Sequence, residues 1–188
     1  GLAAAAHLLA RGLPVKVYEG GVSPAANIRE WGHVKLFSPW TYNIDKQARV
    51  LLEKTGWQEP LPLAYPTGQQ LYDLYLKPLS ATPELSAVIE TNAKVTGVAR
   101  EGFDKMKTAG RDQAPFVLTV RKADGSERED LARAVIDASG TWSQPNPIGT
   151  HGMPVPGEKA NARYIAYGIP DVLGKDIDTY ANKRVLVL

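Results

Sequence analysis

The amino-acid sequence predicts an α/β fold, with a parallel sheet flanked by helices and a set of antiparallel strands beside it. Three observations predict this class. A helical pattern in residues 2–9 is followed at once by a short strand pattern, two further helical patterns lie between residues 45 and 81, and strand patterns prevail from residue 94 to 138. A helix followed directly by a strand is typical of a β-α-β unit, which builds parallel sheets.

The first element is a helix with one apolar face. This face consists of residues spaced i, i+3, i+4 and i+7, namely Leu2, Ala5, Ala6 and Leu9. Gly12 follows the last of them and is expected to end the helix. In residues 15–18 Val15 and Val17 alternate with Lys16 and Tyr18, as in a short strand, and paired glycines end the pattern. We expect this to be the second half of a β-α-β unit whose first strand is missing.

Two helices are expected in the next part of the chain. Asp45 is placed to cap the first of them, and Gly56 is placed to end it. The second runs from about Gly68 to Ala81 by its apolar spacing. Pro78 should kink or shorten this helix, because proline has no backbone N–H to donate.

Strands follow from residue 94. They are predicted at residues 94–100 with a β-bulge at Gly97, at residues 116–122, and in the apolar run 133–140, with a hairpin turn at Asp124-Gly125. The last segment, KRVLVL at residues 183–188, has the continuous apolar character of a buried parallel strand. Such a strand needs partners on both sides, so we expect the chain to be a fragment of a longer protein at both ends.

Composition narrows the class of protein. The chain has 188 residues, and its 22 Lys and Arg against 20 Asp and Glu give a net charge of +2 with the two signs interspersed, which argues against nucleic acid as a partner. The absence of cysteine excludes disulfides, thiolate metal sites and a Cys nucleophile in these residues. No apolar run reaches the roughly 20 residues that span a bilayer, and the start has no signal-peptide pattern. We expect a soluble, cytoplasmic protein without a membrane partner or a metal.

Gly1 and Glu19 match part of a dinucleotide-binding pattern. In that pattern, glycines after the first strand let backbone N–H groups approach the pyrophosphate, and an acid ending the second strand accepts hydrogen bonds from ribose hydroxyls. Gly1 has the place of the last glycine and Glu19 that of the ribose acceptor. From these two residues alone, an ordinary α/β unit with a solvated Glu19 is an equally good interpretation.

Several segments of the chain together resemble one protein family. They are LAAAAHLLARGLPVKVYEGG, AYPTGQQLYDLYLKPL, VIDASGTWSQPNPIG with GMPVPGE, and KRVLVL. In this order they are similar to flavoproteins with two dinucleotide-binding domains, and most of all to flavin-dependent monooxygenases and their bacterial relatives. The resemblance implies that residues 1–182 form a partial Rossmann-type FAD-binding domain with an antiparallel β-meander and its first strand missing. Residues 183–188 would be the first strand of an absent NAD(P)-binding domain.

The resemblance also implies which residues contact the cofactor. Gly1 matches the third fingerprint glycine and Glu19 the ribose acid, while Ser139, Gly140 and Thr141 lie in a segment like the family's Ala-Thr-Gly-type turn near the flavin. The family's loop over the pyrophosphate and flavin corresponds to NIREWGHVKLFSPW. In this loop Arg29 is a candidate phosphate contact, Trp31 and Trp40 are candidates for stacking on or walling off the flavin ring, and Ser38 is a weaker candidate for a hydrogen bond to its edge. Core packing for both tryptophans and a surface ion pair for Arg29 are the alternatives.

The expected activity is that of an FAD-dependent oxidoreductase that uses NADPH or NADH and oxygenates a small molecule. No side chain is assigned as catalytic, since the cofactor carries such chemistry. The chain lacks the Phe-x-Gly-x-x-x-His signature of many monooxygenases, which leaves the reaction type and the substrate open. Two alternatives stay open as well: a dithiol-disulfide reductase with its cysteines in the absent domain, and an α/β fragment that binds nothing. By themselves these 188 residues are expected to hold FAD weakly or not at all, because the first strand and the other two fingerprint glycines are not among them.

Overall fold

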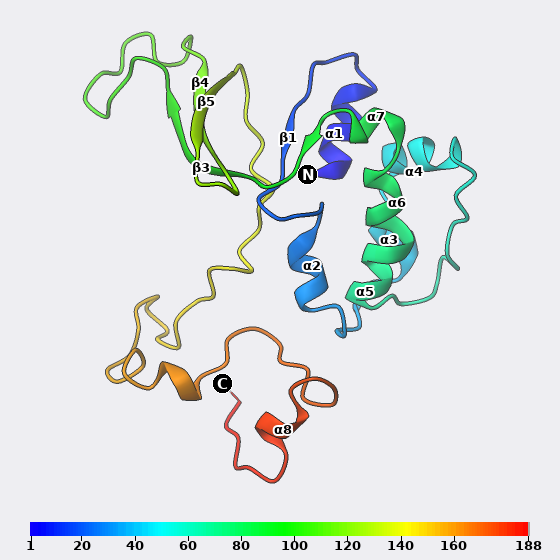
Figure 1. Cartoon of the computed structure of the whole chain (residues 1–188), viewed down its shortest axis with the longest axis vertical. Helices are drawn as coiled ribbons and strands as arrows, with labels where there is room; N and C mark the ends of the chain where they lie inside the picture. The colour runs from blue at the N-terminus through cyan, green and yellow to red at the C-terminus, as the bar shows by residue number, and fades with distance from the viewer. Residues whose placement is uncertain (188) are drawn as a thin grey trace.

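Two small sheets contain the strands of the computed structural model, which describes residues 1–187 (Figure 1). In the first, β1 (Val17–Tyr18) pairs in parallel with β2 (Ile89–Glu90). In the second, β3 (Ala93–Arg100), β4 (Phe116–Lys122) and β5 (Glu127–Ala132) form an antiparallel meander in the order β3-β4-β5. The expected α/β class is therefore confirmed at this coarse level, as a mixed fold with one parallel and one antiparallel sheet.

Helices pack beside the parallel pair and form the main core. They are α1 (Leu2–Leu9), α2 (Ala26–Glu30), α3 (Trp40–Asn43), α4 (Lys46–Glu53), α5 (Gly68–Leu71), the π-helix η1 (Tyr72–Leu76), α6 (Lys77–Ser80) and α7 (Pro83–Ser86). The buried side chains of this cluster include Ala5, Ala6, Trp40, Ile44, Ala48, Leu51, Leu52, Tyr75, Leu79 and Leu85. The meander has its own small cluster around Leu118 and Val120. No helix within residues 1–187 combines the length and the apolar character needed to cross a membrane.

The first helices form as their local sequence predicts. Gly12 has a φ of 69° just after α1, a left-handed conformation that ends the helix and that glycine adopts without strain. Asp45 caps α4, because its Oδ1 accepts hydrogen bonds from the backbone N–H groups of Gln47 at 2.8 Å and Ala48 at 3.1 Å. Gly56, with a φ of 77°, follows this helix. These predictions are confirmed.

Pro78 distorts the helix in which it lies. The predicted helix at residues 68–81 exists, but it widens into the π-helix η1 directly before the proline. The backbone N–H of Lys77 bonds to Tyr72 O, five residues back. In a regular helix the carbonyl of Leu74 would accept a hydrogen bond from residue 78, but Pro78 has no N–H. The indole N–H of Trp57 donates to Leu74 O instead, at 2.7 Å. The sequence thus predicts where the irregularity lies, and the structure shows its form.

The meander confirms most of the predicted strands and corrects one. A register shift between Val95 and Gly97 marks the bulge, and the hairpin turn lies at Asp124-Gly125 between β4 and β5. The predicted strand at residues 133–140 is wrong: the return strand is β5, and residues 134–140 form no regular element. The apolar run was the clearer signal in the sequence, but β5 lies next along the chain and turns Arg128 and Asp130 inward as an ion-paired face.

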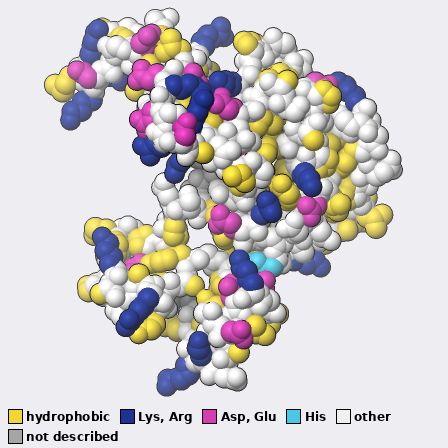
Figure 2. All heavy atoms as spheres, in the orientation of Figure 1, with side chains coloured by type: hydrophobic (Ala, Val, Ile, Leu, Met, Phe, Trp, Pro, Cys, Tyr) yellow, Lys and Arg dark blue, Asp and Glu magenta, His cyan; other side chains and the backbone are white. Residues whose placement is uncertain are grey.

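The C-terminal region, from residue 141 on, is mostly irregular. It contains the 3₁₀-helix η2 (Ala162–Tyr164) and α8 (Ile177–Tyr180). In Figures 1 and 2 most of it forms a separate lobe below the meander and the helices, nearest to α2. Residues 184–187 form no strand, with Val187 88% exposed, and Leu188 lies outside the described residues. The strand expected at residues 183–188 is thus not formed in its described part. A buried parallel strand is stable only beside partner strands, and none pairs with these residues in the part of the chain that the structure describes.

Candidate functional site

Glu19 lies at the carboxyl end of β1 and holds the loop that follows it. Its Oε1 accepts a hydrogen bond from Gly21 N at 2.8 Å, and its Oε2 accepts one from Ala25 N at 3.1 Å. Gly21 is required here, because a Cβ at this position would lie 2.6 Å from the Cβ of Ala26. Each carboxylate oxygen keeps a lone pair after these bonds, so Glu19 can still accept hydrogen bonds from a ligand.

The N-terminus of α1 lies beside the turn at residues 137–140. Gly1 is the N-cap residue of α1, no side chain caps this end, and no acidic residue lies in the first turn. A Cβ on Gly1 would meet the Cβ of Ala138 at 3.9 Å. The first N–H groups of a helix lack partners within the helix and carry partial positive charge, so this end can bind an anion.

The turn itself is closed by local hydrogen bonds. Asp137 Oδ1 accepts from Ser139 Oγ at 2.7 Å and from Ser139 N at 3.0 Å, and these bonds lower the pKa of Asp137. Gly140 has a φ of 69°, and Thr141 is exposed. The turn thus meets the N-terminus of α1 through Ala138, and the residues that follow, Ser139, Gly140 and Thr141, are exposed to solvent.

A pair of tryptophans joins this segment to α2. The ring centroids of Trp31 and Trp142 are 6.5 Å apart at an interplanar angle of 54°, a tilted arrangement that aromatic rings favour. The indole N–H of Trp142 donates to Glu30 Oε2 at 2.6 Å. Trp31, a predicted site residue, is thereby brought next to the segment that contains the predicted turn.

The remaining predicted residues have other partners. The guanidinium of Arg29 lies 5.3 Å from the ring centroid of Tyr72. Ser38 donates to Asn43 Oδ1 at 2.8 Å, at the start of α3. Trp40 is only 3% exposed and belongs to the main core. For Trp40 the alternative interpretation, core packing, describes the structure, so this ring has no open face for a flavin.

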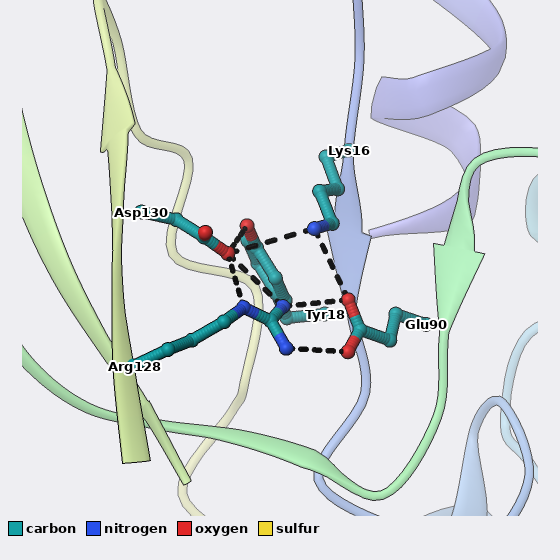
Figure 3. Close-up of polar contacts among 5 residues, drawn as sticks. All are labelled: Lys16, Tyr18, Glu90, Arg128 and Asp130. Carbon is teal, nitrogen blue, oxygen red and sulfur yellow. Dashed lines mark hydrogen bonds and ion pairs between the residues drawn. The ribbon is translucent and has the colours of Figure 1, made fainter. Parts of the chain in front are cut away.

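A network of polar and charged side chains joins β1 and β2 to β5 (Figure 3). Arg128 binds Glu90 through two nitrogens, at 2.9 and 2.7 Å, and also binds Asp130 at 3.0 Å. Lys16 lies 3.1 Å from Glu90, and the hydroxyl of Tyr18 donates to Asp130 at 2.6 Å. Arg128, and after it Lys16, lower the pKa of Glu90 to about 2. Because Tyr18 directly precedes Glu19, the network also fixes the end of β1 from which Glu19 projects.

The pKa values of the other two acids in the network change for related reasons. The hydrogen bond from Tyr18 is the main cause that lowers the pKa of Asp130, with a further contribution from Arg128. Burial, and then the hydrogen bond to Asp130, raises the pKa of Tyr18 above its ordinary value. The network therefore stays fully ionised at neutral pH, with Tyr18 as a neutral donor.

Sequence reasoning missed Glu30, Trp142 and this network. Trp142 stands one residue after the predicted turn, so its position in SGTWS was a usable signal for a role in the site. Arg128 and Asp130 alternate with exposed charged residues, which is the spacing of one face of a strand. This pattern predicts β5 only if one allows that oppositely charged side chains can point inward as pairs. Comparisons of the chain with known protein families, characterised proteins and solved structures find no match.

Proposed function

We propose that the chain is the FAD-binding part of an FAD-dependent oxidoreductase that uses NADPH or NADH and acts on a small molecule in the manner of a flavin monooxygenase. One observation carries the proposal: three features that such a cofactor needs gather at one end of the parallel pair. They are the Glu19 carboxylate after β1, the uncapped N-terminus of α1, and the turn at residues 137–141 beside it. In Figure 1 α1 runs back along β1, so its N-terminus lies toward the end from which Glu19 projects.

The available donors and acceptors fit the chemistry of FAD. Glu19 has free lone pairs for the hydroxyls of the adenosine ribose. The N–H groups at the start of α1 suit the pyrophosphate, and Gly1 leaves them open because it has no side chain. The exposed turn at Ser139 to Thr141 and the ring of Trp31 would contact the flavin. Bound FAD supplies hydride acceptance from NADPH or NADH and, once reduced, reaction with dioxygen.

Of the other predicted residues, Arg29 has a smaller part in this proposal, and Ser38 and Trp40 have none. Arg29 is exposed and has no carboxylate partner among the described residues, so its guanidinium is available to a phosphate. Ser38 already donates to Asn43, and Trp40 lies in the core, so neither is assigned to the flavin. The part of the protein that binds NADPH or NADH would lie beyond the C-terminal region described above.

The test uses the protein purified as the whole product of its gene. We expect it to carry FAD or to take it up, and to oxidise NADPH or NADH in the presence of dioxygen. Glu19→Gln keeps the size of the side chain but loses its charge, and should weaken FAD binding about tenfold, the loss typical of one charge-assisted hydrogen bond. The new NH₂ group also faces the N–H of Gly21 or Ala25 and loosens the loop. Binding of FMN, which has no adenosine ribose, should therefore fall less than binding of FAD. Glu129→Gln, an exposed change on β5, is the matched control.

The proposal fails if the wild-type protein takes up no flavin and oxidises neither nicotinamide cofactor. It also needs revision if Glu19→Gln weakens FAD and FMN equally, because the carboxylate would then act through the fold rather than through the ribose. Residues 1–188 by themselves are expected to bind FAD weakly or not at all, because two of the three fingerprint glycines are not among them.

A further inference from the structure

Trp142 connects three separate parts of the protein. Its indole N–H donates to Glu30 Oε2 on α2 at 2.6 Å, and its ring meets Trp31 at 6.5 Å between centroids. On another side its ring lies against Gly168, farther along the C-terminal region, where a Cβ would lie 3.1 Å from the indole Cη2. Trp142 is half-buried by these contacts, although its neighbours in the chain are exposed.

The turn at residues 137–141 has no comparable anchor of its own. Its hydrogen bonds are local: Asp137 accepts from Ser139, and Thr141 O accepts from Gln144 N at 2.9 Å. No strand pairs with the turn in the described part of the chain. Bonds within a turn fix its shape but leave its position relative to other elements free. Trp142 is bonded covalently to Thr141, the last residue of the turn, so any constraint on the indole also constrains the turn.

We propose that Trp142 is a positioning residue for the flavin: through Glu30 and Trp31 it holds the turn at residues 139–141 in register with α2. This inference rests on the proposed function. It adds that the two segments expected to contact the flavin, the turn and the end of α2 with Trp31, are held together by one indole. Glu19, the proposed ribose acceptor, is connected to the same contacts. It holds the loop at Gly21 and Ala25, and this loop leads directly into α2.

Trp142→Phe tests the role by removing the indole donor while keeping an aromatic ring against Trp31. In the whole gene product we expect FAD affinity to fall about tenfold, the loss of one hydrogen bond to a charged acceptor. We also expect the absorbance spectrum and fluorescence quenching of the flavin that does bind to change, since the turn beside the ring is no longer held. A purely structural role would leave the spectrum of the bound flavin unaltered.

Trp57→Phe is a matched control. Its indole also donates one hydrogen bond, to Leu74 O at 2.7 Å, but it lies in the helical part of the protein away from the turn. This variant should lose stability, while the folded protein keeps wild-type FAD affinity and a wild-type flavin spectrum. The contrast separates loss of an indole hydrogen bond in general from loss of this one.

Substitutions at Glu30 test the partner. Glu30→Gln keeps an oxygen acceptor and should retain most of the wild-type affinity and spectrum, whereas Glu30→Ala should match Trp142→Phe. Combining Trp142→Phe with Glu30→Ala should cause no further loss, because both remove the same contact.

The outcomes separate the two proposals. A wild-type protein without flavin overturns the proposed function and this inference with it. A wild-type protein that binds FAD, together with a Trp142→Phe variant of equal affinity and identical flavin spectrum, overturns the positioning role alone. Additive losses in the double variant would also contradict it, since the two residues would then act independently.

Discussion

Arg128 on β5 donates hydrogen bonds to both carboxylate oxygens of Glu90 on β2, from Nη1 to Oε1 at 2.9 Å and from Nη2 to Oε2 at 2.7 Å. Bidentate contacts of this kind are strong because the planar guanidinium matches the carboxylate in geometry as well as charge. The parallel pair consists of only two residues from each strand, so it has few hydrogen bonds of its own. The Arg128–Glu90 contact is therefore a main connection between the parallel pair and the meander.

The first prediction concerns acid stability. The pKa of Glu90 is about 2 in the folded protein, against 4.5 as its ordinary value. A carboxylate whose pKa is lowered by folding stabilises the folded state at pH values above its ordinary pKa. This stabilisation is lost as the pH falls from 4.5 through 2. Glu90→Gln should therefore cost about 1 kcal/mol of unfolding free energy at pH 7, given that the side chains are partly exposed. It should also flatten the pH dependence in the acid range, as measured by urea unfolding.

Glu129→Gln is the control for this experiment, because Glu129 is exposed on the same strand and has no ion pair among residues 1–187. It should leave both the neutral stability and the acid profile as in the wild type. An acid profile of Glu90→Gln that parallels the wild type would contradict the ionised contact.

The second prediction concerns the cap of α4. Asp45 accepts two backbone hydrogen bonds and a third contact from His7 Nε2 at 3.0 Å. Asp45→Ala should lower the free energy of unfolding by about 1 kcal/mol, the usual cost of losing an N-cap. Asp45→Asn should cost only a few tenths, because asparagine caps nearly as well. Equal losses in the two variants would show that the charge opposite His7, rather than the cap, stabilises the helix.

Local signals in the sequence predicted the first half of the fold well. Helix caps and stops depend on the residue itself, as at Asp45 and Gly56, so they can be read without knowing what packs nearby. The hairpin turn at Asp124-Gly125 and the bulge near Gly97 are of the same kind. Pro78 likewise predicts that its helix is irregular, but it does not predict that the irregularity is a π-helix.

Signals that depend on distant partners failed. The apolar run at residues 133–140 has the composition of a strand, but no strand lies beside it in the described structure, whereas β5 pairs with β4 and turns paired charges inward. In the site, Glu19 and the turn could be proposed from chain order, but the burial of Trp40 could not. The contact between Glu30 and Trp142 spans more than a hundred residues, so nothing local indicates it.

The third prediction concerns the C-terminal region. Glu158 is 5% exposed and accepts hydrogen bonds from Ile148 N at 3.1 Å, from Val155 N at 2.8 Å and from the hydroxyl of Tyr167. Glu158→Gln turns one of these acceptors into an NH₂ donor that faces another donor. Limited proteolysis within residues 141–187 should therefore become several-fold faster, as for a small rise in local opening.

Lys159→Gln, at the neighbouring exposed position, should leave the cleavage rate unchanged. Tyr167→Phe, which removes one donor, should accelerate cleavage less than Glu158→Gln does. Equal rates for wild type and Glu158→Gln would mean that this carboxylate does not organise the region.

The fourth prediction concerns Gly68, which lets the ring of Trp31 lie against α5. A Cβ at Gly68 would come within 2.6 Å of Trp31 Cε3 and 2.8 Å of its backbone oxygen, and a backbone atom cannot move aside as a flexible side chain can. Gly68→Ala should therefore cost about 1–3 kcal/mol in urea unfolding, as overpacking does, and alter the near-UV circular dichroism of the tryptophans. Gly97→Ala is the control, since its new methyl would meet Thr119 Oγ1 at 3.5 Å and Thr119 Cβ at 3.7 Å, which are ordinary contacts. If the two variants proved equally stable, Trp31 would have to be free to shift, and the contact with Trp142 would not define the position of α2.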